Sequence, residues 1–323
     1  MTEVAGHMRK DSEEISEKII NLDENVLLAL NFFAKNPPPS VNIDEFRSPF
    51  VVGSGNAFNT GTIMFSGKDA TFADESNFRS IIASSNKKTQ EGLFRDVVVI
   101  SASGGKDSVW EIELAKKYGL KTTLLTTKPQ SDAARVADKT IAFKSIAEPY
   151  TYNFSTYEGM VLGAKPEDPL KIKEFIESLK FPDNFADHKG YAFVVPDQFM
   201  QVCPMLDIKK SELFGPYVSL RAFSQGHARH AKFVIKTPEE LVISLGQRSE
   251  HFGDPDHRWD INLPQGTNFA TIMAVTYYIV GRIQASKPPY FKENIARYVS
   301  EDGPKAYGHN TPPFDIIVPG SKS

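Results

Sequence analysis

Residues 96–143 read DVVVISASGGKDSVWEIELAKKYGLKTTLLTTKPQSDAARVADKTIAF. The run Val97–Ile100 is apolar and β-branched, which is typical of a strand that is buried on both faces of a sheet. A turn rich in glycine and serine follows, and then an amphipathic helix that ends at Gly119. A second strand is expected at residues 122–127. A strand–turn–helix–strand unit of this kind predicts a parallel sheet.

The turn at residues 101–108 reads SASGGKDS and has the composition of an anion-binding turn. Glycines let the backbone approach a ligand, a helix N-terminus offers free N–H groups, and hydroxyls add donors. The alternative is a helix cap without a ligand, which rarely needs so many glycines and serines beside a lysine. We therefore expect a phosphate group to be bound by Ser101, Ser103, the backbone of Gly104 and Gly105, Lys106 and Ser108.

The chain has 323 residues, of which 41% are hydrophobic and 24% are charged, as in ordinary globular proteins. Its net charge of -3 gives no reason to expect a nucleic-acid partner. Cys203 is the single cysteine, so an internal disulfide and a cysteine-cluster metal site are excluded. The longest apolar run, Phe269–Gly281, is too short to span a bilayer. We expect a cytoplasmic protein without a cofactor, a metal or a membrane contact.

The pattern of strands and helices occurs twice along the chain. Apolar strands are expected near residues 49–52 and 70–73 before the central turn, and near residues 191–195 and 241–245 after it. A polar linker separates the two sets. We divide the chain into residues 1–45 (an expression-tag remnant and a helix), 46–180 (a first α/β domain) and 181–323 (a second α/β domain with a C-terminal helix and tail).

The order of the motifs resembles that of the sugar isomerase (SIS) domain family. The turn SASGGKDS is similar to the S-x-S-G-x-T-x-E turn of that family, and residues 53–58, GSGNAF, resemble its G-S-G-x-[SA] turn. Residues 130–138 and 154–157 are similar to two later family segments. The resemblance covers roughly residues 46–300 and implies two flavodoxin-like or Rossmann-like parallel-sheet halves flanked by helices. The alternative is the PP-loop ATP pyrophosphatases, whose signature SGGKDS also matches, although that motif normally follows the first strand.

The second half is similar to the isomerase domain of glucosamine-6-phosphate synthase. Residues 203–213, CPMLDIKKSEL, resemble the helix that opens its second SIS half, and residues 288–297 resemble its C-terminal tail. Arg297 stands where that tail has a lysine. The loop 246–258 contains histidines and aspartates but lacks the spacing of a metal site, so we expect it to be solvated.

The resemblance implies a phosphosugar isomerase, or a related deglycase, that works through an enediolate. Such chemistry needs a base to move a proton between C1 and C2 and an acid to open the sugar ring. Glu212 is the candidate base, one helical turn after Lys209, although a surface ion pair would have the same spacing. His230 is the candidate ring-opening group, with His227 as the second choice, and a solvated basic loop is the alternative.

The resemblance also implies further contacts and partners. It gives Arg297 a role in balancing charge on the ring oxygen, and it implies a homodimer in which the histidine reaches the partner's site. A non-catalytic sugar-phosphate sensor is the alternative from another functional class. The polar wall of the sugar site is expected to contain Ser54, Asn56 and Ser155.

Overall fold

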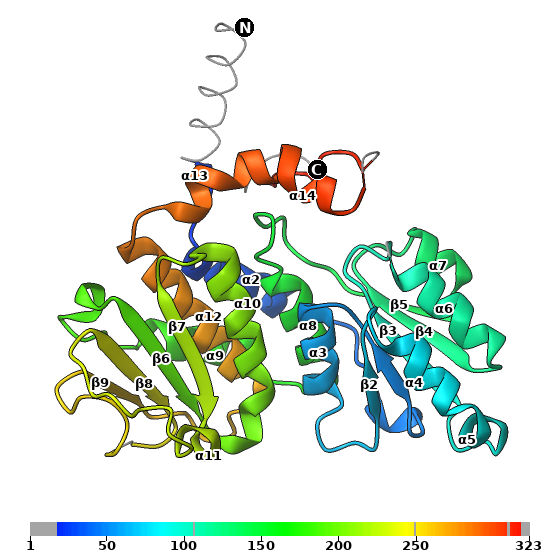
Figure 1. Ribbon diagram of the computed structural model, residues 1–323, viewed down its shortest axis with the longest axis horizontal. Helices are drawn as coiled ribbons and strands as arrows, with labels where there is room; N and C mark the ends of the chain where they lie inside the picture. Colours follow the sequence, from blue (N-terminus) through cyan, green and yellow to red (C-terminus); the bar gives the residue numbers. More distant parts are fainter. Residues whose placement is uncertain (1–17, 106, 249, 309–310, 318–323) are drawn as a thin grey trace, which may run out of the picture.

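The computed structural model describes residues 18–105, 107–248, 250–308 and 311–317. These residues form two lobes, each built on a parallel sheet, with a C-terminal segment lying across the top of the molecule (Figure 1). No helix in the described ranges has the length and apolar character needed to cross a bilayer. The α/β class predicted from the sequence, with two parallel-sheet halves, is confirmed.

The first lobe contains a five-stranded sheet in the order β2-β1-β3-β4-β5. All neighbouring strands run parallel. The strands are β1 (Phe50–Val52), β2 (Thr71–Ala73), β3 (Asp96–Ile100), β4 (Lys121–Thr126) and β5 (Lys139–Ala142). The helices are α3 (Asn56–Met64), α4 (Phe78–Ser84), α5 (Asn86–Gln90), α6 (Asp107–Lys117), α7 (Asp132–Val136) and α8 (Phe154–Ala164). Helix α9 (Pro169–Glu177) comes next in the sequence but packs against helices of the second lobe (Figure 1).

The second lobe contains a four-stranded parallel sheet in the order β7-β6-β8-β9. Its strands are β6 (Gly190–Val195), β7 (Ser219–Ser224), β8 (Glu240–Leu245) and β9 (Arg258–Ile261). The helices that accompany it are α2 (Leu22–Lys35), α10 (Cys203–Leu213), α11 (Gln225–Ala228) and α12 (Phe269–Ser286). The segment across the top consists of α13 (Tyr290–Arg297), the π-helical turn η4 (Tyr298–Asp302) and α14 (Gly303–Ala306).

Strand β3 shows why these runs form central strands. Val97 and Val99 belong to the apolar cluster on one face of the sheet, and Val98 and Ile100 belong to the cluster on the other face. Because both faces are covered, every one of these side chains is apolar and at most 1% exposed.

Strands β5, β7 and β9 were not predicted from the sequence, and all three are edge strands. An edge strand has a partner on one side only and keeps more polar side chains than a central strand. Strand β7 reads SLRAFS and β9 reads RWDI, so neither has a continuous apolar run.

The N-terminal helix α2 precedes the first lobe in sequence but packs against α12 (Figure 1). A Cβ atom at Gly281 of α12 would lie 1.9 Å from the backbone nitrogen of Asp23, so only glycine allows the two helices to approach this closely. The Gln284 side chain accepts a hydrogen bond from the backbone N–H of Leu22 at 2.9 Å. It also donates to the Tyr152 hydroxyl, which lies between β5 and α8, at 3.0 Å. These contacts join the two halves of the chain.

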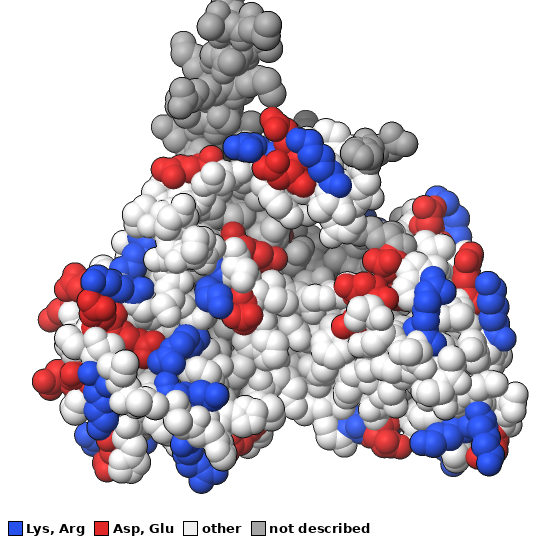
Figure 2. Space-filling model, in the orientation of Figure 1, with Lys and Arg blue, Asp and Glu red and all other residues white. Residues whose placement is uncertain are grey.

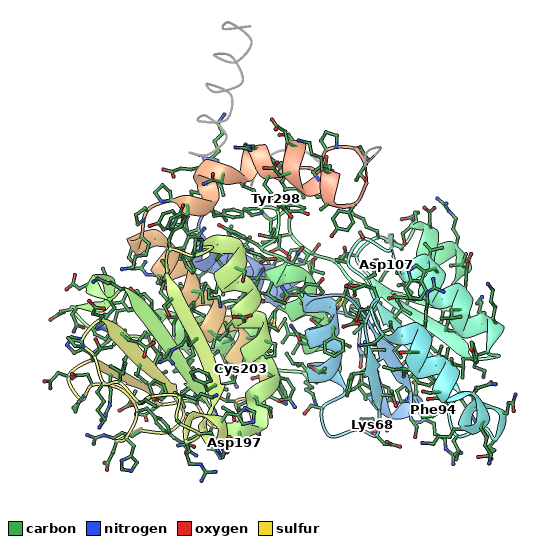
Figure 3. All side chains as sticks on the ribbon, in the orientation of Figure 1. Lys68, Phe94, Asp107, Asp197, Cys203 and Tyr298 are labelled. Carbon is green, nitrogen blue, oxygen red and sulfur yellow. The ribbon has the colours of Figure 1, made fainter. Side chains whose placement is uncertain are left out.

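The carboxyl ends of the two sheets lie at opposite ends of the molecule. Asp107 follows β3 and lies near the top of the first lobe, whereas Asp197 follows β6 and lies near the bottom of the second lobe (Figure 3). Sites at the carboxyl ends of the two sheets are therefore far apart within one chain.

Candidate functional site

The turn after β3 lies at the position where a sheet of this topology binds ligands. In the strand order β2-β1-β3-β4-β5, the chain first adds β2 on one side of β1 and then adds β3, β4 and β5 on the other side. The switch point of the topology therefore lies between β1 and β3. Ligands of doubly wound sheets bind beyond the carboxyl ends of the strands at that switch point. The structure therefore places the turns after Val52 and Ile100, which the sequence analysis singled out, side by side.

The conformation of the turn depends on Gly104, which has φ +59°. Its N–H donates to the Ser101 carbonyl at 3.3 Å and to the Ser101 hydroxyl at 3.2 Å. A Cβ atom here would lie 2.0 Å from Oγ of Ser131. Both the backbone angle and the lack of space require glycine.

The neighbouring strand and turn hold the turn in place. The Ala102 carbonyl accepts hydrogen bonds from the hydroxyls of Thr126 and Thr127, at 3.0 and 2.9 Å. The Gly104 carbonyl accepts from the N–H of Ala133 at 3.0 Å. A turn that is fixed in this way does not need to reorganise when an anion binds.

The expected phosphate contacts differ in their availability. Ser108 is 3% exposed, and its hydroxyl donates to the Gly105 carbonyl at 2.7 Å, so its proton is already used within the turn. Ser103 is exposed. Within the part of the chain that the structure describes, the amides of Ser103 and Gly105 donate to no protein atom. These amides and the hydroxyls of Ser101 and Ser103 are the donors of the turn that are left for a ligand among the described residues, while Lys106 lies outside them.

The turn is bordered by an acidic group that consists of Asp74, Glu75, Asp107 and Glu111. Glu111 is 2% exposed, and burial, followed by the charges of Asp107, Glu75 and Asp74, raises its pKa to about 8. The Asp107 carboxylate accepts from the indole N–H of Trp110 at 2.8 Å. Figure 2 shows acidic side chains gathered at this end of the first lobe. The negative charges of these carboxylates repel a phosphate dianion in the turn. Protonation of Glu111 removes one of the charges and would favour phosphate binding.

The turn after β1 contributes one buried polar atom. Oδ1 of Asn56 has no hydrogen-bond partner among the described residues, and the side chain is only 7% exposed. Ser54, two residues earlier, is exposed. An unpaired buried acceptor is costly, and the hydroxyl of a ligand could supply the missing donor.

Ser155 lies in a different environment from the one expected. It is fully buried, and its hydroxyl donates to Glu148 at 2.8 Å and accepts from the N–H of Ile146 at 3.2 Å. Glu148 also accepts from the Asn25 side chain at 2.6 Å, which ties α8 to α2. This hydroxyl has no capacity left for a sugar, so the geometry supports a structural role for Ser155.

Lys209 and Glu212 form an ion pair at 2.5 Å on α10. The Lys209 side chain is fully buried and also donates to the Thr151 carbonyl, in the connection before α8. Its ammonium group lies 5.7 Å from the ring centre of Tyr277. Burial raises the pKa of Glu212, and the Lys209 charge opposes that rise. A partly buried carboxylate with a raised pKa has the properties of a general base that works near neutral pH.

Aromatic side chains near the C-terminus pack on Tyr150, whose hydroxyl is affected by the Glu212 charge. Tyr298 lies on the side of the segment that faces the lobes (Figure 3), with its ring centre 6.1 Å from that of Tyr150. Phe314 stacks on Tyr150, with the two ring centres 5.3 Å apart. Burial, the neighbouring tyrosines and the Glu212 charge together raise the pKa of Tyr150 to about 12. This segment thus forms a cover over the region of Glu212.

Arg297 is directed differently from its neighbour Tyr298. Its side chain is 73% exposed and lies 3.4 Å from the Asp302 carboxylate. Its expected role in ring chemistry stays a prediction that this geometry does not support.

His227 and His230 lie on and just after α11, at the carboxyl end of the second sheet, and both are exposed. The N–H of neighbouring Gly226 donates to Asp197, which Figure 3 places at the lower end of the second lobe. A single chain therefore does not bring these histidines to the turn after β3. Their catalytic role remains a prediction that requires a second copy of the chain.

Two cavities of the described structure lie away from this region. One of 280 Å³ is lined by α2, α8 and the start of α9, and one of 680 Å³ lies in the second lobe. Among the described residues, no group of three or more His, Cys, Asp and Glu side chains is placed to hold a metal ion.

The fold of this chain is similar to that of several solved structures. No protein-family model matches the sequence, and no curated protein matches it. Solved structures do match: the C-terminal domain of glucosamine-fructose-6-phosphate aminotransferase from Francisella tularensis is 12% identical with a TM-score of 0.54, over 85% of this chain and 93% of that chain. Tagatose-6-phosphate ketose/aldose isomerase from Escherichia coli is 11% identical with a TM-score of 0.51, over 98% of both chains.

A third match has the same architecture. Glucosamine-6-phosphate deaminase from Thermotoga maritima is 14% identical with a TM-score of 0.51, over 88% of this chain and 94% of that chain. The double-SIS fold predicted from the sequence resemblance is thus confirmed. At these identities the matches establish the fold, while the chemistry has to be argued from the site.

Sequence reasoning missed the tyrosines of the site. Tyr277 lies in the apolar run of α12, while Tyr150 and Tyr298 lie in separate segments without a motif. Only the three-dimensional proximity of Tyr277 to Lys209 and the effect of the Glu212 charge on Tyr150 and Tyr298 distinguish them from ordinary packing aromatics.

Proposed function

We propose that the chain binds a sugar phosphate between its two lobes and isomerises it between the aldose and ketose forms. The phosphate group binds to the free amides of Ser103 and Gly105 and to the Ser103 hydroxyl. Asn56 accepts a hydrogen bond from a sugar hydroxyl. Glu212 moves the proton between C1 and C2.

The observation that carries the proposal is the Lys209–Glu212 pair. The exposed pair Asp207–Lys210 on the same helix has the same i,i+3 spacing, but its lysine is 32% exposed whereas Lys209 is fully buried. Burying an ammonium group is costly unless it has a specific task or partner. Here it stabilises the charged form of a carboxylate whose pKa is raised by burial, which suits a base that must gain and lose a proton.

Binding without turnover is the second candidate function. Two observations favour it: the acidic group beside the turn after β3, and the distance of His227 and His230 from that turn within one chain. A sensor needs the phosphate contacts but neither the base nor the ring-opening group.

Deuterium exchange separates the two functions. The protein is incubated with fructose 6-phosphate in heavy water, and NMR follows deuterium at C1 and C2. We expect exchange in the wild type and its loss in Glu212→Gln, with sugar-phosphate affinity retained. The matched control is Asp207→Asn, which alters the exposed pair on the same helix and should keep full exchange. Binding without exchange would support the sensor and exclude the isomerase. Failure to bind any hexose phosphate would refute both functions.

The contribution of the histidines can be tested by mixing variants. If a homodimer brings His227 or His230 to the partner's site, a His227→Ala/His230→Ala chain and a Glu212→Gln chain are each inactive alone. Mixed dimers contain one site with both groups intact, so activity should return on mixing. Full activity of the double histidine variant would contradict this role. Replacing fructose 6-phosphate with a phosphorylated sugar–amine adduct and measuring amine release tests the deglycase form of the reaction.

A further inference from the structure

A cavity of 680 Å³ in the second lobe has no role in the proposed isomerisation. It is bounded by α11 and by the connections that follow α11 and β8. Its volume lies within the range of about 300–1,000 Å³ that is typical of small-molecule sites.

The cavity lies at the ligand-binding position of its own sheet. In the order β7-β6-β8-β9, the chain adds β7 on one side of β6 and then β8 and β9 on the other side, so the switch point lies between β6 and β8. Ligands of such sheets bind beyond the carboxyl ends of the strands at the switch point. Asp197 follows β6 and Arg248 follows β8, and both line the cavity. Figure 3 shows Asp197 at the far end of the molecule from Asp107, which marks the turn after β3.

Three cationic side chains line the cavity. They are Arg229, Lys232 and Arg248, and the lining also contains the carboxylates of Asp197 and Glu250. The Asp197 carboxylate accepts from the N–H of Gly226 at 2.6 Å, which lowers the pKa of Asp197 and places its charge at the start of α11. Arg248 lies 3.9 Å from the Asp260 carboxylate. The lining therefore carries an excess of cations, which attracts an anion.

Two aromatic rings also line the cavity. The rings of Phe233 and Phe252 both line it and stack with their centres 5.2 Å apart. Phe223 packs edge-on against Phe233 at 6.0 Å. Such a surface favours contact with a flat apolar group.

Hydrogen bonds hold both connections that carry these side chains. The Arg221 guanidinium bonds the Glu240 carboxylate at 2.9 and 2.6 Å and donates to the Lys232 carbonyl at 2.8 Å. The Arg258 guanidinium donates to the Phe252 carbonyl at 2.6 Å. These bonds fix the backbone at Lys232 and Phe252 to side chains of the sheet strands.

We propose that this cavity binds a nucleoside phosphate. The base stacks against Phe252, because Phe233 already carries the Arg221 guanidinium 5.1 Å from its ring centre, and the phosphate groups pair with Arg229, Lys232 and Arg248. A sugar phosphate without a base would satisfy the cations but would leave the Phe252 ring unused. The site is separate from that of the proposed isomerisation and does not depend on it.

Calorimetric titration with UDP, ADP, ribose 5-phosphate and inorganic phosphate tests the proposal. We expect the nucleotides to bind more tightly than ribose 5-phosphate, with affinity falling as salt is added. Lys232→Glu and Arg248→Glu should each lower nucleotide affinity about tenfold or more. The matched control is Lys236→Glu, which makes the same charge change at an exposed position outside the cavity and should leave affinity unaltered. Phe252→Leu should weaken nucleotide binding and leave phosphate binding unchanged.

Several results would overturn the proposal. The absence of binding by both nucleotides would remove the site, as would an equal effect of Lys236→Glu. Loss of nucleotide binding in Ser103→Ala would place the nucleotide in the first lobe. Ribose 5-phosphate binding as tightly as UDP would refute the assigned ligand class. Deuterium exchange into fructose 6-phosphate reports on Glu212 and on the turn after β3, which do not line this cavity, so its failure would leave these results intact.

Discussion

Glu111 makes stability depend on pH in a direction opposite to that of an ordinary paired carboxylate. Its side chain is 2% exposed, one carboxyl oxygen has no hydrogen-bond partner among the described residues, and its pKa is raised from 4.5 to about 8. The folded chain therefore keeps a proton that the unfolded chain releases between these two pH values. Because the folded state binds more protons in this window, its stability falls as the pH rises from 4.5 to 8.

The structure sets the size of this effect. At about 1.4 kcal/mol for each pH unit between the two pKa values, the loss reaches at most about 5 kcal/mol by pH 8. Glu111→Gln keeps the shape of the side chain and removes its titration. We expect the variant to gain stability over the wild type progressively across this window, and no further above pH 8.

Urea unfolding at pH 5, 6, 7, 8 and 9 measures the difference between the two proteins. Glu113→Gln, at an exposed position on the same helix, serves as the control and should show a difference that does not change with pH. A difference between Glu111→Gln and the wild type that stays constant from pH 5 to pH 9 would refute the reasoning.

Three other substitutions test the packing and the site. Gly104→Ala should cost about 1–3 kcal/mol for its left-handed backbone alone, and should weaken hexose 6-phosphate binding in a titration; unchanged affinity would remove the turn from the site. Lys209→Met should cost about 3 kcal/mol in urea unfolding because it leaves Glu212 partly buried and unpaired, and adding Glu212→Gln should recover part of that loss. No recovery would show that the pair is not coupled. Gly281→Ala should lower the melting temperature by several degrees because its Cβ atom has no space against α2, and a neutral effect would mean that α2 and α12 separate easily.

The sequence was most informative where one physical requirement dominates. Continuous apolar runs such as Val97–Ile100 identify central strands because both faces of the sheet are covered. Gly104 could be predicted as part of a tight turn because few residues other than glycine adopt its backbone angle. Edge strands such as β7 escaped notice because one side of them lacks a partner strand.

The candidate site was only partly predictable because its members depend on tertiary contacts. The spacing of Lys209 and Glu212 indicates a helical pair, but the same spacing occurs in the exposed pair Asp207–Lys210. Burial alone distinguishes the two. Ser155 shows the opposite case, since its motif indicated a ligand contact while the fold uses its hydroxyl for Glu148.

The shared core of the two lobes limits how the molecule can open. One continuous apolar cluster contains side chains from the first sheet, such as Val98, from the second sheet, such as Phe193, and from α2 and α12 between them. A hinge between rigid halves would have to break this cluster, so the lobes should melt together and neither should survive when expressed alone. The terminal segment belongs to the same cluster through Phe291, Ile295 and Val299, so it is anchored to both lobes and should unfold together with them.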